Sequence, residues 1–134
     1  MDLRRLLALA LIAAALPAGA HAGTDKGEKK KAGGLNFIQI ETLTATIVHP
    51  NGRRGVLTME TGLDVPDEKL RARADSLQPR LRAAFVQSLQ IYAAGLPPAT
   101  PPNLEYLSRE LQRETDQVIG KPGAKLLLGT VLVN

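Results

Sequence analysis

An Asn-Gly pair between two strand-like segments restricts the fold of this chain more than any other feature. Asn51-Gly52 separates residues 37–49, which are rich in isoleucine, threonine and valine, from residues 54–65, in which apolar residues alternate with others. Both segments have the composition of a β-strand. Because asparagine and glycine both tolerate the positive φ of a tight turn, the pair predicts a β-hairpin built from these two segments.

The pattern leaves the register of this hairpin open. A two-residue loop pairs Thr44 with Met59, whereas a three-residue loop pairs Leu43 with Met59 and Ala45 with Leu57. Both arrangements bury apolar side chains on one face of the hairpin, so the sequence does not choose between them.

The middle of the chain predicts two amphipathic helices. Apolar residues recur at steps of three and four from about Asp67 to Ala93 and keep their phase across Pro79, which predicts one kinked helix or two nearly coaxial ones. After the proline-rich segment 95–102, Asn103 is the expected N-cap of a second helix that ends at Gly120. The apolar stripe expected on this second helix consists of Leu104, Leu107, Leu111 and Val118.

The last element predicted is a strand, Leu126–Val133, that is apolar on both faces apart from Gly129 and Thr130. We expect a helix layer on one side of it and another subunit on the other. The order strand, strand, helix, helix, strand predicts an α+β fold, a three-stranded antiparallel-type sheet with a helical hairpin on one face. The residues expected to mediate self-association are Leu126, Leu127, Leu128, Val131, Leu132 and Val133.

Residues 1–22 have the organisation of a secretory signal peptide. Arg4 and Arg5 form the basic start, Leu6–Leu16 is apolar, and Ala20-His21-Ala22 fits the A-x-A cleavage rule. A spanning helix needs about 20 apolar residues, so we expect cleavage and release into the periplasm, with an uncleaved inner-membrane anchor as the alternative. The Sec route is favoured over the twin-arginine route, because an arginine pair is common in any basic signal start.

The remainder of the chain divides into a tether and one domain. Residues 23–35 are mostly polar and glycine-rich, which is typical of a flexible tether. Residues 36–134 have the length of a single small domain. Because the chain has no cysteine, this domain is expected to be held together by packing and by association with other subunits rather than by disulfides.

The composition also excludes several classes of function. Loss of residues 1–22 removes Asp2, Arg4 and Arg5 from the 17 basic and 13 acidic residues, which leaves a net charge of only +3. This mild charge, with four aromatic residues, is not the pattern of a nucleic-acid-binding protein. His49 is the one histidine that remains after cleavage, and no glycine-rich phosphate loop is present. We therefore expect no metal, no cofactor and no enzymatic activity.

A pair of carboxylates in the hairpin is the nearest approach to a catalytic arrangement. Glu41 and Glu60 are able to face each other across the two strands, which is a weak suggestion of acid-base chemistry. Solvated strand residues are the favoured interpretation. The hydrolase hypothesis therefore ranks below binding and assembly.

Four arginines border the apolar stripe of the first predicted helix. At 100° per residue, Arg73 and Arg80 fall in one row and Arg71 and Arg82 in another, on either side of the stripe. Such side chains commonly border a core with their stems. They also suit docking to an acidic protein or to anionic lipid headgroups. Both interpretations stay open.

The arrangement as a whole resembles the flagellar basal-body-associated FliL family, whose periplasmic domain is stomatin/prohibitin-like. The resemblance covers residues 37–134 and rests on the strand pair, on Pro79-Arg80-Leu81-Arg82, on the segment Leu104–Ile119 and on the C-terminal Val131-Leu132-Val133-Asn134. It implies a non-enzymatic, self-assembling domain that serves as an accessory of the flagellar motor or of another envelope complex. The alternative is a peripheral binder of anionic lipid or cell-wall polymer, acting through Lys29–Lys31 and the four arginines.

Overall fold

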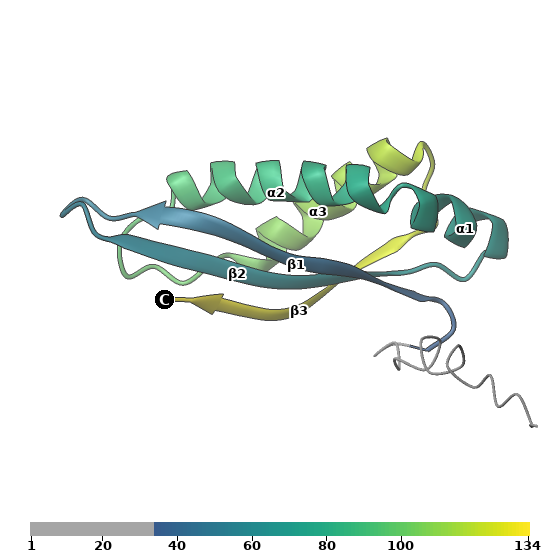
Figure 1. The fold of residues 1–134 in the computed structure, drawn as a ribbon, viewed down its shortest axis with the longest axis horizontal. Coiled ribbons are helices and arrows are strands. Elements are labelled where there is room, and N and C mark those ends of the chain that lie inside the picture. Colours follow the sequence, from purple (N-terminus) through teal and green to yellow (C-terminus); the bar gives the residue numbers. More distant parts are fainter. Residues whose placement is uncertain (1–33) are drawn as a thin grey trace, which may run out of the picture.

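The structure, a computed structural model, describes residues 34–134. Its elements are β1 (Phe37–Val48), β2 (Arg54–Asp64), α1 (Glu68–Ser76), α2 (Gln78–Ala94), α3 (Leu104–Ile119) and β3 (Lys125–Val133). The three strands form one sheet in the order β1-β2-β3 with antiparallel neighbours, and the helices lie on one of its faces (Figure 1). The predicted α+β architecture is confirmed. The predicted signal peptide and residues 23–33 of the predicted tether lie outside the described residues.

The turn between β1 and β2 selects the three-residue loop. The N–H of His49 donates to the carbonyl of Arg53 at 2.8 Å, and the N–H of Gly52 donates to the carbonyl of His49 at 2.9 Å. Gly52 has a φ of 81°. Asn51 does not adopt a positive φ, and its side chain accepts from the N–H of Arg53 at 3.0 Å. A turn closed by one left-handed glycine is the usual geometry of a three-residue hairpin loop.

A bulge in β1 then changes the register farther from the turn. Next to the turn Leu43 lies opposite Met59, as the three-residue loop requires, but beyond a shift between Ile40 and Leu43 the partner of Ile40 is Thr61. Ile40 and Leu43 are both buried although they are three residues apart. The bulge therefore keeps the side chains on both sides of it directed at the same core.

The first helical segment forms two helices rather than one with a kink. Leu77, with φ −97° and ψ 6°, separates α1 from α2, and its N–H donates to the carbonyls of Arg73 and Ala74. Pro79 lies in the first turn of α2, where its missing N–H leaves no helical hydrogen bond unmade. α1 and α2 follow one another along the molecule (Figure 1), which agrees with the second alternative considered for this segment.

Helix α3 begins and ends where the sequence predicts. Asn103 Oδ1 accepts from the N–H of Tyr106 at 3.0 Å, and Gly120, with a φ of 91°, ends the helix. The predicted stripe is partly wrong, because Leu104 is 48% exposed at the start of the helix and Val118 is only half-buried. The buried residues of α3 are Leu107, Leu111, Thr115 and Ile119.

The core lies between the helices and one face of the sheet. α2 packs over β1 and α3 over β3, and β2 runs between them. Leu57, Met59 and Leu63 of β2 have no exposed surface. Phe85 of α2 is the fully buried aromatic side chain in an otherwise aliphatic core. The described helices leave the opposite face of the sheet uncovered.

Candidate functional site

The two glutamates of the hairpin contact different parts of the domain. Oε2 of Glu41 lies 3.2 Å from Nε of Arg82 in α2. Glu60 instead lies against Gly129 of β3, where an added Cβ would stand 3.1 Å from the Cβ of Glu60. Within residues 34–134, no group of three or more His, Asp or Glu side chains is placed to hold a metal ion. The two carboxylates of the suggested acid-base arrangement therefore have different neighbours, Arg82 for Glu41 and β3 for Glu60.

Arg71 has a structural role that the sequence did not reveal. Its Nη1 donates to Oδ1 of Asn36 at 3.1 Å, to the carbonyl of Val65 at 3.0 Å and to the carbonyl of Pro66 at 3.3 Å. These bonds connect the start of β1 to the connection between β2 and α1. Nη1 of Arg71 is thus bonded within the domain.

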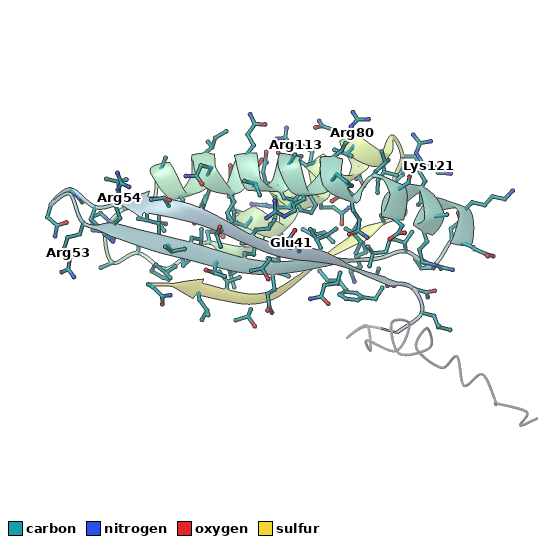
Figure 2. All side chains as sticks on the ribbon, in the orientation of Figure 1. Glu41, Arg53, Arg54, Arg80, Arg113 and Lys121 are labelled. Atoms are coloured by element: carbon teal, nitrogen blue, oxygen red, sulfur yellow. The ribbon has the colours of Figure 1, made fainter. Side chains whose placement is uncertain are left out.

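Of the other three arginines, Arg82 forms an ion pair, whereas Arg73 and Arg80 are exposed. The Arg82–Glu41 pair is an ion pair without hydrogen-bond geometry, because Arg82 Nε has no acceptor in its N–H direction. Arg73 and Arg80 are exposed and have no carboxylate within 4 Å in the described part of the chain. The Arg73 guanidinium reaches to within 3.2 Å of where a Cβ would stand on Gly120, next to Lys121. Figure 2 labels Arg80 and Lys121 on the helical side of the molecule.

Strand β3 is, with β1, one of the two outer strands of the sheet, and its backbone has no neighbouring strand along one side. Asn134 exchanges two 3.0 Å hydrogen bonds with Val56 of β2. In an antiparallel ladder, paired and unpaired positions alternate. Val133 opposite Leu57 and Val131 opposite Met59 are therefore unpaired positions, whose N–H and carbonyl groups point away from β2. No described strand lies beyond them.

The side chains of the predicted self-association strand differ in their exposure. Leu126 is 5% exposed and belongs to the core, which contradicts its expected role in association. Leu128 and Val131 are half-buried. Leu127 is 37%, Leu132 52% and Val133 42% exposed. The exposed apolar surface of β3 thus consists mainly of Leu132 and Val133 at its C-terminal end. Leu127 is exposed separately, near the start of the strand.

Gln112 of α3 forms hydrogen bonds with the backbone at the beginning of the free edge of β3. Its Nε2 donates to the carbonyl of Ala124 at 2.8 Å, and its Oε1 accepts from the N–H of Leu126 at 2.8 Å. One side-chain amide therefore pairs with a backbone carbonyl and N–H as a neighbouring strand would. The sequence gives no signal for this contact, because Gln112 is one polar residue of an amphipathic helix. The unprotected part of the edge begins after it, at Leu128.

Apolar and threonine side chains also line the uncovered face of the sheet. Val48 is 65% and Val56 41% exposed, and Thr44, Thr58 and Leu132 stand opposite one another across the three strands. A small hollow of about 220 Å³ lies at the other end of this face. The Phe37 ring covers Gly62 there, where an added Cβ would stand only 2.2 Å from the ring.

Comparison with known proteins adds no family to this description. No protein-family model matches the chain, and no curated protein sequence matches it. No helix among residues 34–134 is long and apolar enough to cross a membrane. The resemblance to the FliL family therefore stays a prediction.

The contacts of Gln112 predict a measurable loss of stability when they are removed. Replacing Gln112 with leucine leaves the Ala124 carbonyl and the Leu126 N–H without partners in a partly buried place. We expect Gln112→Leu to lower the free energy of unfolding by about 2–4 kcal/mol, since each unpaired group costs about 1–3 kcal/mol. Urea denaturation of the purified protein measures this change.

The matched control is Gln117→Leu, the same substitution at an exposed position of α3. We expect its stability to stay within about 0.5 kcal/mol of the wild type. Equal losses of stability in the two variants would contradict the role assigned to Gln112.

Proposed function

We propose that this domain is a non-enzymatic scaffold that associates with copies of itself and serves as an adaptor in the periplasm. Its envelope complex is the flagellar motor or another membrane assembly, as the resemblance to the FliL family implies. The single observation that supports the scaffold is the unpartnered, uncharged edge of β3. Release into the periplasm rests on the sequence of residues 1–22 alone.

The edge of β3 lacks most devices that keep sheet edges from pairing. Charged side chains, prolines and bulges usually protect such an edge. From Leu126 to Asn134 the chain has neither a charged residue nor a proline, although a bulge opposite Glu60 interrupts the strand. A second copy that paired its own β3 along residues 126–134 would meet no charged side chain there. Val131 and Val133 would then exchange backbone hydrogen bonds with that copy.

The free energies involved indicate that pairing through the β3 edge is weak without a further contact. Covering the exposed parts of Leu127, Leu132 and Val133 contributes about 1 kcal/mol for each side chain, or about 6 kcal/mol for two copies. Association costs about 4–15 kcal/mol in lost motion. The two values are similar, so assembly should depend strongly on protein concentration. A partner complex that gathers copies in one place would favour it further.

Binding to an anionic surface is the second candidate function. Arg73, Arg80 and Lys121 are exposed cations that support it, whereas Arg71 and Arg82 already have partners within the domain. Flotation with phosphatidylglycerol vesicles at low salt tests this candidate. Binding that Arg73→Gln and Arg80→Gln together abolish, and that salt weakens, would support it. Vesicle binding that does not change with salt or with the two substitutions would eliminate this candidate function.

A lysine on the β3 edge tests the scaffold directly. We expect the wild type to self-associate as its concentration rises and Val133→Lys to remain monomeric, because each copy would bring a charged lysine into the paired strands, close to that of the other copy. Sedimentation velocity over a concentration series measures the association. Thermal unfolding should be nearly unchanged, since Val133 is 42% exposed at the end of the sheet.

Leu104→Lys is the matched control, because Leu104 is similarly exposed, at 48%, but lies at the start of α3. This variant should associate like the wild type. The scaffold proposal fails if the wild type stays monomeric at every concentration, or if both lysine variants weaken association equally.

A further inference from the structure

We infer that a groove between the end of α2 and the start of α3 binds a short peptide segment of a partner protein, with apolar or prolyl side chains next to a basic one. This site is separate from the β3 edge, since no residue of β3 lines it. It therefore adds a second kind of contact to self-association.

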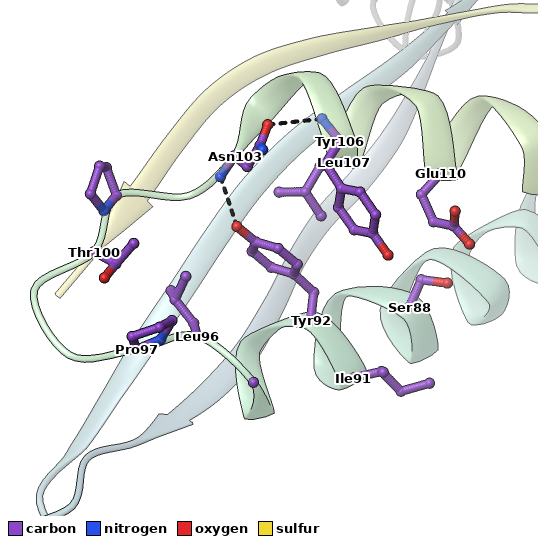
Figure 3. A pocket seen from close by; sticks show the side chains of 12 residues that line it. Ser88, Ile91, Tyr92, Leu96, Pro97, Thr100, Asn103, Tyr106, Leu107 and Glu110 are labelled. Carbon is purple, nitrogen blue, oxygen red and sulfur yellow. Dashed lines mark hydrogen bonds between the residues drawn. The ribbon is translucent and has the colours of Figure 1, made fainter.

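The groove is formed where the proline-rich loop connects the two helices (Figure 3). It has a volume of about 490 Å³, which is large enough for one or two side chains of a ligand. Its apolar lining comes from both helices and from the loop. The lining side chains include Ile91, Tyr92, Leu96, Tyr106, Ser88 and Glu110.

The walls of the groove are held in place before any ligand arrives. The N–H of Asn103 donates to the Tyr92 hydroxyl at 2.7 Å, and Asn103 Oδ1 accepts from the N–H of Tyr106 at 3.0 Å. The rings of Tyr92 and Tyr106 stack with centroids 5.8 Å apart and an angle of 26° between them. Figure 3 shows these rings side by side with Asn103 above them. A rigid aromatic wall binds a ligand with little loss of its own conformational freedom.

Two large apolar side chains of the groove are exposed to solvent. Ile91 is 68% and Tyr106 44% exposed, one on each side of the groove. Aromatic side chains are the usual lining of sites that accept the prolyl side chains of an extended peptide. The lining thus suits the apolar part of the ligand.

Acidic groups at one end of the groove favour a ligand with a basic side chain. Glu110 is the charged residue among the lining residues, although its Oε1 also pairs with Arg113. Glu114 follows one helical turn later and accepts a hydrogen bond from Ser88, which also lines the groove. The other oxygen of Glu114 is buried without a hydrogen-bond partner in the described part of the chain. A lysine or arginine on the ligand would meet the Glu110 carboxylate in the groove, with the negative charge of Glu114 buried behind it.

Selection from a random peptide library displayed on phage tests this inference without a presumed ligand. We expect the purified protein to enrich peptides that combine apolar residues or proline with arginine or lysine. The selected peptides should bind Tyr106→Ala and Glu110→Lys at least about tenfold more weakly than the wild type. Isothermal titration calorimetry with the synthetic peptides measures these affinities.

Two further variants keep the test independent of folding. Tyr106→Phe preserves the ring and should retain binding, whereas Ile91→Ala alters a mostly exposed side chain and should weaken binding without lowering thermal stability. The inference is overturned if no peptide is enriched, if acidic peptides bind equally well, or if binding is unaffected in Tyr106→Ala. It is also overturned if Tyr106→Ala abolishes self-association, because the groove would then hold a second copy of the chain.

Discussion

Burial of one face of a three-stranded sheet beneath α2 and α3 is the interaction on which the rest of this structure depends. Leu81, Phe85 and Leu89 of α2 are fully buried over the inner face of the hairpin. With no cysteine in the chain, this apolar packing takes the place of disulfides. Among residues 34–134 there is nothing to cover the second face of the sheet or the outer edge of β3. The surfaces proposed for self-association therefore follow directly from one-sided packing.

Much of the fold was predictable because local signals agreed with the packing. Asn51-Gly52, Asn103 and Gly120 each mark a boundary that the structure confirms. The register was harder, because Ile38 and Ile40 are spaced to face the core in one phase of the strand and Leu43 in the other. A change of phase within one strand indicates a bulge, and this signal was present in the sequence. Neither simple register described the whole hairpin for that reason.

The candidate surfaces were predictable only in part. Arg71 and Arg73 both border the apolar stripe in the helical pattern, yet Arg71 donates three hydrogen bonds within the domain and Arg73 is exposed. Leu126 was expected to be available for association, but it is buried and its N–H is bonded to Gln112. Such differences depend on tertiary contacts between distant residues, which periodicity does not contain. The groove beside Tyr106 has the same origin, since it requires the crossing of two helices and a loop.

The central claim is that the free backbone edge of β3 pairs with another copy. Amide hydrogen exchange at Val131 and Val133, measured over a series of protein concentrations, tests it most directly. The Leu126 amide is the internal reference, because it is bonded to Gln112 within a single copy. The account predicts that exchange at both valines slows as concentration rises while the reference does not change. Exchange at the valines that stays fast at concentrations where the protein is associated would contradict it.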